Sequence, residues 1–311
     1  MNFSSDFSAN KDRLLKILKN KNKILNFTHI DMDGIGANIV LSKLFSNVVR
    51  IDVNYHDIDE RIRNFDFSEF QFVIFTDICP VNSLEYLSQF DNVIILDHHQ
   101  TAAPFCNPEK NVFVYEGLSG TKLTHEFLKS MFGNLSQLSE IDELVDIIND
   151  YDMWIRKNPK STYFNWLFNK YKADEFKTRF ISGNTKLLKD EKDFILSQHD
   201  TINRMFDALE INEFETVNGA MFLFDDYVND LGQMVMDKYK YDFIIMINKS
   251  NLSASVRSVG ECDVATMLSS LGIGGGHKNA AGFRNVSSDI LMYNMKNIEQ
   301  YVYRFYKFVR K

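Results

Sequence analysis

Cysteine and long hydrophobic runs are both scarce in this 311-residue sequence. Its three cysteines, Cys79, Cys106 and Cys262, form no C-x-x-C pair, which excludes a disulfide-stapled secreted domain and a thiolate zinc site. We expect them to be small buried hydrophobic groups. No segment approaches the roughly 20 apolar residues that cross a bilayer, and residues 1–23 lack the apolar stretch of a signal peptide. The sequence therefore favours a soluble, cytoplasmic protein without a membrane partner.

Positive charge is also in short supply. The chain has 35 basic and 42 acidic side chains, which gives a net charge of −7. Proteins that bind long nucleic acid usually carry a broad basic surface, so we expect any nucleic-acid substrate to be short or gripped locally. Hydrophobic residues make up 45% of the chain and include 27 Phe, which is ample for two cores and excludes a disordered or fibrous protein.

The first half of the chain alternates strand-like and helix-like segments, a pattern typical of a parallel sheet covered by helices. Runs rich in Val, Ile and Phe predict five strands, at 23–29, 48–53, 72–77, 92–97 and 111–115. Between them, apolar residues at helical spacing predict helices at 34–45, 81–90 and 119–132. Ser119 is predicted to cap the last of these helices.

The rest of the chain has a helical stretch and then a second mixed region. Residues 153–212 have a helical pattern, and strands follow at 221–224, 241–247 and 253–259 with helices at 225–239 and 262–271. The sequence thus predicts an α/β fold in three parts. These are a parallel-sheet domain at 1–155, a helical connector at 156–215 and a smaller α/β domain at 216–311.

Acidic and histidine residues cluster where three of the predicted strands end: HIDMDG (29–34), IFTD (74–77) and LDHH (96–99). In an open parallel sheet, ligands bind beyond the carboxyl ends of adjacent strands. Residues two apart in an extended chain face the same side, so His29, Asp31 and Asp33 can project together. A single Asp at a strand end is often only a turn residue. The adjacent His98 and His99, however, have no obvious packing role, so we expect these segments to share one cleft.

So many carboxylates in one cleft would repel one another unless positive charge lies among them. Two divalent cations would balance the four negative charges of the candidate aspartates, which are Asp31, Asp33, Asp77 and Asp152. Imidazoles at His29 and His98 add nitrogen ligands, which suits Mn²⁺ or Fe²⁺ better than Mg²⁺ or Ca²⁺. Zinc is a weaker expectation because no cysteine accompanies these motifs.

The segment LGIGGGHKNAAGF (271–283) gathers glycines and small residues into what the sequence predicts to be one turn region. Glycine lets backbone N–H groups approach an anion closely, as in phosphate cradles. A plain turn between a helix and a strand is the alternative. Arg257, on the preceding predicted strand, favours an anion site because a guanidinium binds phosphate or carboxylate through two hydrogen bonds.

Taken together and in this order, the motifs resemble those of the DHH phosphoesterases that carry a DHH-associated C-terminal domain. THIDMDGIGA, IFTD, LDHHQT and NDYDMW are similar to the family's four motifs, and SVRS and GIGGGHKNAAGF to the substrate-binding motifs of the associated domain. The resemblance spans nearly the whole chain. It implies a DHH catalytic domain at 1–155 and a substrate-binding domain at 216–311. The compact H-x-D-x-D spacing at 29–33 looks closer to the oligoribonuclease-like (nano-RNase) branch than to RecJ exonucleases.

The resemblance also implies a metal-binding role for six motif residues. His29 and Asp31 would hold one metal, Asp33, His98 and Asp152 the other, and Asp77 would bridge both. The fourth motif offers both Asp150 and Asp152, and its D-x-W pattern favours Asp152. The implied cofactors are therefore two divalent ions, with Mn²⁺ preferred.

Other residues would act on the substrate. By the same resemblance, His99 would contact the scissile phosphate and Asp97 would orient a neighbouring imidazole. A further set would bind the substrate's terminal phosphate or nucleotide: Arg257, His277 and the backbone of Gly274, Gly275 and Gly276.

The implied activity is two-metal hydrolysis of short oligonucleotides, nanoRNAs or dinucleotides, to 5′-mononucleotides. A cyclic dinucleotide or 3′-phosphoadenosine 5′-phosphate remains open as the substrate, and so does the oligomeric state. D-x-D-G also resembles haloacid-dehalogenase phosphatases, but Ile35 stands where that class expects Thr or Val, and the histidine pair is unexplained. A non-catalytic nucleotide-binding module is a third hypothesis, although every expected ligand position is filled.

Overall fold

The computed structural model describes residues 3–18, 23–63, 65–215, 217–284, 294 and 296–303, apart from the side chains at 3, 68 and 277. The chain divides into two units, Met1–Ile195 and Leu196–Lys311. None of the helices within the described residues has the length and the apolar stretch that a bilayer crossing requires. The three-part division predicted from the sequence stays a prediction.

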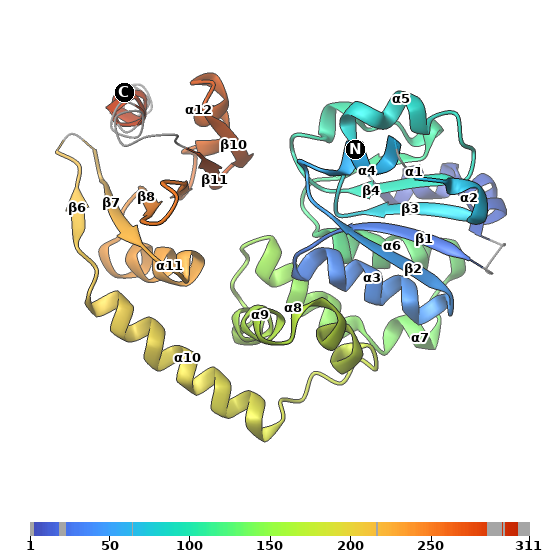
Figure 1. Cartoon of the computed structure of the whole chain (residues 1–311), viewed down its shortest axis with the longest axis horizontal. Helices are drawn as coiled ribbons and strands as arrows, with labels where there is room; N and C mark the ends of the chain where they lie inside the picture. The colour runs from blue at the N-terminus through green and yellow to red at the C-terminus, as the bar shows by residue number, and fades with distance from the viewer. Residues whose placement is uncertain are drawn as a thin grey trace. The chain divides into compact units, whose positions relative to one another are not determined.

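A five-stranded parallel sheet lies at the centre of the first unit (Figure 1). Its strands are β1 (Ile24–His29), β2 (Val48–Val53), β3 (Phe72–Thr76), β4 (Val93–Asp97) and β5 (Val112–Val114). All five were predicted, to within one residue at each end. Their order is β2-β1-β3-β4-β5, so the three strands that end in acidic or histidine residues are neighbours. Because all the strands are parallel, their carboxyl ends meet at one edge of the sheet.

Helices cover both faces of this sheet (Figure 1). The α-helices are α1 (Phe3–Ala9), α2 (Lys11–Leu18), α3 (Met32–Leu44), α4 (Ile58–Arg63), α5 (Leu84–Leu87), α6 (Gly120–Phe132), α7 (Ser136–Ser139) and α8 (Asp142–Asp152). Short 3-10 turns are η1 (Phe67–Glu69), η2 (Val81–Ser83), η3 (Ala103–Phe105) and η4 (Pro108–Lys110). The helix predicted at 81–90 is therefore a 3-10 turn followed by the single turn of α5.

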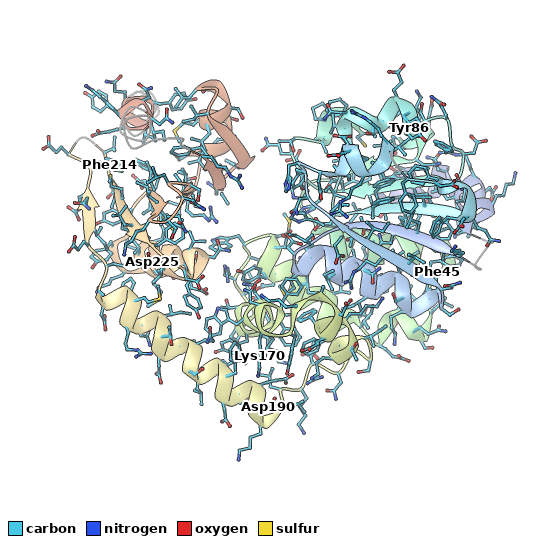
Figure 2. The ribbon with its side chains drawn as sticks, in the orientation of Figure 1. Phe45, Tyr86, Lys170, Asp190, Phe214 and Asp225 are labelled. Carbon is cyan, nitrogen blue, oxygen red and sulfur yellow. The ribbon has the colours of Figure 1, made fainter. Side chains whose placement is uncertain are left out.

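Alternation along the strands builds two hydrophobic cores, because successive strand side chains point to opposite faces. Ile74 of β3 joins the core with α3 and α6, and Phe75 joins the core with α4 and α5. Phe45, which follows α3 and is labelled in Figure 2, packs edge-on against Phe72 with ring centroids 5.6 Å apart. Burial on both faces explains why the two central strands β3 and β4 are continuous apolar runs up to their last residue.

The middle of the chain is helical, as predicted. Its long helices are α9 (Pro159–Phe180) and α10 (Lys189–Asp207). Lys172 has a φ of 59°, which interrupts α9. The ring of Phe180 lies 4.6 Å from that of Phe164 and 4.8 Å from that of Phe176, so the two halves of α9 pack against each other. Lys177 of α9 donates a 2.7 Å hydrogen bond to Asn38 of α3, which ties α9 to the parallel-sheet unit.

The second unit holds a mixed six-stranded sheet in the order β10-β11-β9-β8-β7-β6. Its elements are β6 (Ile211–Glu213), β7 (Gly219–Phe224), α11 (Val228–Tyr239), β8 (Phe243–Asn248), β9 (Ala254–Ser258), α12 (Val264–Ser270), β10 (Gly274–His277) and β11 (Ala280–Phe283). Only β7 and β8 pair in parallel. The predicted α/β character of this region is confirmed. Cys79 and Cys262 are buried, as expected, and Cys106 is partly buried.

The glycine-rich segment is a β-hairpin, so the prediction of a single turn region is wrong. Gly274 pairs with Phe283, and Gly276 with Ala281, across β10 and β11. A Cβ at Gly274 would lie 2.2 Å from the carbonyl oxygen of Gly282, and Gly276 has a φ of +149°. Both positions therefore need glycine to form the hairpin. These two strands were not predicted, because glycine weakens the hydrophobic pattern by which a strand is recognised in a sequence.

Candidate metal centre

The first cluster of polar side chains lies where β1 ends and α3 begins. Asp31 caps α3, because its Oδ1 accepts a 3.0 Å hydrogen bond from the N–H of Gly34. The other oxygen, Oδ2, lies 2.9 Å from Nδ1 of His29. A Cβ at Gly34 would lie 2.1 Å from the carbonyl oxygen of His29. The motif glycine therefore allows α3 to start close enough to β1 for these two side chains to meet.

Asp33, the third polar residue of the H-x-D-x-D motif, faces the N-terminus of α6. The buried carboxylate accepts backbone N–H bonds from Gly120 at 2.5 Å and Thr121 at 2.9 Å. Free N–H groups at a helix N-terminus favour negative charge. Ser119 caps α6, as predicted, by accepting an N–H from its first turn. A Cβ at Gly120 would lie 2.5 Å from Cβ of Asp77, so this glycine lets α6 approach the end of β3.

Asp77 lies between two histidines at the centre of the edge. Its backbone has a φ of 60°, a left-handed conformation that Asp and Asn tolerate better than most residues. Its side chain is buried, with Oδ1 3.0 Å from Nε2 of His98 and Oδ2 3.8 Å from Nδ1 of His29. The two oxygens of one carboxylate thus face two different imidazoles.

Asp97 organises the histidine pair that follows β4. Its Oδ1 accepts the backbone N–H of His98 at 2.8 Å and lies 2.7 Å from Nδ1 of His99. Burial raises the pKa of Asp97, but the hydrogen bond with His99 and the nearby imidazoles outweigh it, so the net pKa is lowered. Asp97 is therefore a carboxylate that fixes the ring of His99. The catalytic roles predicted for these two residues stay predictions.

The fourth motif contributes its second aspartate to the cluster. Asp152 ends α8, and its Oδ2 lies 3.6 Å from Nε2 of His98. The carboxylate of Asp150 instead accepts the backbone N–H groups of Lys157 at 3.0 Å and Asn158 at 3.2 Å. Asp150 thus shapes the loop after α8, whereas Asp152 faces the other candidate ligands.

These side chains form three overlapping groups whose ligand atoms lie within 4.8 Å of one another: His29, Asp31 and Asp77; Asp33, His98 and Asp152; and Asp77, His98 and His99. Asp77 and His98 each belong to two groups, so the six predicted ligands form one continuous cluster. Their assignment as metal ligands stays a prediction.

The electrostatics of the cluster fit a divalent metal. Burial and the charges of Asp33 and Asp31 raise the pKa of Asp77 well above that of an ordinary aspartate, and they also raise the pKa of Asp152. Within the described part of the chain, Oδ2 of Asp77 and Oδ2 of Asp152 are buried without a hydrogen-bond partner. Buried carboxylate oxygens beside imidazole nitrogens are a suitable donor set for a divalent cation.

No family model matches the chain. Two curated relatives align with most of it. The 3′,5′-cyclic-nucleotide phosphodiesterase of Helicobacter pylori is 22% identical, over 84% of this chain and 92% of the relative. Oligoribonuclease NrnB of Bacillus subtilis is 23% identical, over 82% of this chain and 71% of the relative.

Solved structures share the fold. RecJ of Thermus thermophilus in complex with Mn²⁺ has a TM-score of 0.57 at 14% identity, over 96% of this chain and 55% of its own. The DHH domain of a member of a ribosomal-protein family has a TM-score of 0.60 at 14% identity, over 96% and 92% of the two chains. The chain therefore has the fold of a DHH domain. The pGpG-specific phosphodiesterase PggH of Vibrio cholerae resembles it with a TM-score of 0.54 at 13% identity, over 90% and 98%.

One residue beside the cluster was not predicted. Tyr55 follows β2, and its hydroxyl lies 2.8 Å from Nε2 of His99. Its ring centroid lies 5.3 Å from those of both His29 and His99. Because β2 is parallel to β1, the residues after β2 reach the same edge of the sheet. That position was the available signal, but Tyr55 belongs to no acidic or histidine motif.

In the second unit, the backbone aligns the predicted substrate-binding residues. Arg257 of β9 pairs with Ala280, which pairs with His277, so the three lie in one cross-strand row. Arg257 donates hydrogen bonds to Asn229 Oδ1 at 2.7 Å and to the carbonyl of Val256 at 3.0 Å. The side chain of His277 lies outside the described residues. Substrate binding by this row and by the glycine hairpin stays a prediction.

Proposed function

We propose that this protein is a DHH phosphoesterase, a divalent-metal-dependent phosphodiesterase that hydrolyses nanoRNAs and dinucleotides to 5′-mononucleotides. The proposal rests on the cluster of aspartates and histidines around Asp77 at the edge of the parallel sheet. The relatives named oligoribonuclease NrnB and pGpG-specific phosphodiesterase support a short substrate. The net charge of −7 also disfavours long nucleic acid as the main partner.

Two ions would share the cluster through Asp77. One would be held by His29 and Asp31, and the other by Asp33, His98 and Asp152. Asp77 suits the shared position because its two oxygens face His98 and His29. When bound, such ions act as Lewis acids on a phosphate and activate water for attack. Mn²⁺ is our choice because it accepts mixed carboxylate and imidazole ligands.

His99 is placed to act on the phosphate. Asp97 accepts the proton on Nδ1, which makes Nε2 the ring atom that can meet the substrate. In the imidazolium form, Nε2–H donates a hydrogen bond to a phosphate oxygen and stabilises the negative charge that develops there. The same N–H can deliver its proton to the departing alkoxide. The neighbouring Asp97 carboxylate would stabilise the ring while it carries this proton.

The second unit would bind the far end of the substrate. Arg257 offers a guanidinium in the row that includes Ala280, beside the glycine hairpin. Of the hairpin glycines, Gly275 has the most room, since a Cβ there would meet nothing closer than Ser269 Oγ at 3.6 Å. A phosphate or nucleotide can therefore approach the backbone at this position. The expected contribution is to substrate affinity.

A cyclic nucleotide is the second candidate substrate, because the Helicobacter pylori relative is named a 3′,5′-cyclic-nucleotide phosphodiesterase. The chemistry at the metal cluster would be the same, since both substrates contain a phosphodiester. 3′-Phosphoadenosine 5′-phosphate differs, because it offers a terminal phosphomonoester.

The test is nucleotide release from a panel of substrates, with Mn²⁺ and with a chelator. The panel contains RNAs of two, five and twenty-four nucleotides, a cyclic dinucleotide, a 3′,5′-cyclic mononucleotide and 3′-phosphoadenosine 5′-phosphate. We expect Mn²⁺-dependent release of 5′-mononucleotides, fastest from the two-nucleotide RNA. Preference for a cyclic substrate would move the function to signal degradation. No turnover of any substrate, together with tight nucleotide binding, would point to a binding module.

A further inference from the structure

Tyr55 lies in a hydrogen-bonded turn after β2, at the edge of the sheet where the candidate metal ligands gather. The N–H of Asn54 donates to Oδ1 of Asp57 at 2.7 Å, and the N–H of Asp57 donates to the carbonyl of Asn54 at 3.2 Å. Arg61 of α4 adds a 2.8 Å ion pair to the same carboxylate. These bonds fix the backbone of the turn on both sides of Tyr55.

The side chain of Tyr55 is fixed at one end and open elsewhere. Its hydroxyl lies 2.8 Å from each ring nitrogen of His99, and Oδ1 of Asp97 lies 2.7 Å from Nδ1 of the same ring. Its ring lies edge-on to His99, with an interplanar angle of 82°, and is tilted by 49° against His29. Even so, Tyr55 remains 48% exposed. A core tyrosine would be covered, so this ring presents an open aromatic surface next to the two imidazoles.

We propose that Tyr55 positions the nucleotide beside the scissile phosphate: its exposed ring stacks on the nucleobase, and the contacts of that ring with His29 and His99 fix the base relative to the metal cluster. This inference rests on the proposed function, because it needs a nucleotide phosphate at His99. Tyr55 is a substrate-positioning residue in this account.

The geometry favours a base as the occupant. If His99 contacts the phosphate, the nucleoside attached to that phosphate must lie next to the imidazole, where the Tyr55 ring is. Bases stack on aromatic side chains with little dependence on sequence, because every base has a π-face. A short substrate has few phosphates to grip, so stacking supplies affinity that backbone contacts cannot. Tyr55 therefore gives the centre a preference for nucleotides over other phosphodiesters.

The test compares enzyme variants on a two-nucleotide RNA and on two analogues that lack either the 5′ or the 3′ base. Tyr55→Leu removes the ring, Tyr55→Phe removes only the hydroxyl, and Tyr55→Trp restores a stacking surface. Tyr86→Leu is the matched control, because Tyr86, labelled in Figure 2, is 39% exposed on α5 of the same unit and belongs to none of the three ligand groups. The readouts are kcat and KM with saturating Mn²⁺.

We expect Tyr55→Leu to lower kcat/KM about tenfold on the intact RNA, mainly through KM, and to leave one abasic analogue unaffected. Tyr55→Phe keeps KM within about twofold and lowers kcat about fivefold, since His99 loses one hydrogen bond. Tyr55→Trp retains the discrimination against the abasic analogue. Tyr86→Leu changes nothing.

Two outcomes contradict the inference and can be told apart. In the first, the wild type is active, but Tyr55→Leu lowers kcat/KM by the same factor on all three substrates, or on none of them. This result overturns the role of Tyr55 and leaves the proposed function standing. A wild type that cleaves none of the substrates with Mn²⁺ overturns the proposed function, and this inference with it. Tyr55→Phe guards against a folding artefact, because it keeps the ring packing.

Discussion

Replacing Asp77 with Asn is expected to stabilise the metal-free protein while abolishing its activity. Asp77 is 1% exposed, and its carboxylate shares a group with Asp31 in which the ligand atoms lie within 4.8 Å of one another. Asn keeps the shape of the side chain and tolerates the left-handed backbone at this position, where φ is 60°. The substitution therefore removes charge with little strain, and it also removes a proposed shared metal ligand.

The size of the effect follows from the charges. Two carboxylates about 4 Å apart repel by roughly 4 kcal/mol at an effective dielectric constant of 20. The hydrogen bond between Asp77 and His98 and partial protonation of Asp77 offset part of this repulsion. We expect a net gain of about 1–2 kcal/mol in the free energy of unfolding at pH 8, or roughly 2–6 °C in Tm for a protein of this size.

The pH dependence of this gain has a definite sign. Burial and the charges of Asp33 and Asp31 raise the pKa of Asp77 in the folded state above its unfolded value. The stability that this group contributes is therefore present at low pH and lost as the pH rises through the folded-state value. Asn does not undergo that loss, so the gain from Asp77→Asn is larger at pH 8 than at pH 5.

The assay is thermal and chemical unfolding in a chelating buffer at pH 5 and pH 8. Asp150→Asn is the control, because the buried Asp150 carboxylate accepts two backbone N–H groups. We expect this substitution to lower the free energy of unfolding by about 1–3 kcal/mol. If Asp77→Asn were less stable than the wild type at pH 8 without metal, the repulsion inferred for the cluster would be refuted.

Three further outcomes are expected. Mn²⁺ affinity falls from pH 8 to pH 6 and Mn²⁺ binding releases protons, because the raised pKa values of Asp77 and Asp152 keep these carboxyls partly protonated in the metal-free protein. Calorimetry in buffers of different ionisation enthalpy checks the number of protons released. Asp97→Asn lowers kcat about 10–100-fold while Mn²⁺ content is unchanged, because His99 loses its orienting carboxylate; unchanged kcat would contradict the role. Arg257→Ala chiefly raises KM in steady-state kinetics, and a loss confined to kcat would contradict its assignment to substrate binding.

The parallel-sheet unit was predictable because its signals are local. Its strands are continuous runs of Val, Ile and Phe, and burial on both faces requires that composition. The convergence of the motifs was predictable for a general reason. Any polar side chains that follow neighbouring parallel strands meet at one edge, so His29, Asp77 and His98 had to lie near one another once the strand order placed β1, β3 and β4 side by side.

Other features depend on contacts that no local pattern records. The D-x-W pattern favours Asp152 over Asp150, but no local pattern shows that the carboxylate of Asp150 accepts the backbone N–H groups of Lys157 and Asn158. The hairpin of β10 and β11 was concealed because glycine is a turn signal, whereas here Gly274 is needed for close packing of two strands. Tyr55 was concealed because an aromatic residue after a strand is ordinarily a packing residue.

The central claim is that this edge of the sheet holds two metal ions with Asp77 between them. The most direct measurement is the number of Mn²⁺ ions bound per chain, by equilibrium dialysis, in the wild type and in Asp77→Asn, with turnover of a two-nucleotide RNA followed on the same samples. The account predicts two ions in an active wild type and a loss of at least one ion, with no turnover, in the variant. An Asp77→Asn protein that still binds two ions and cleaves the RNA would contradict it.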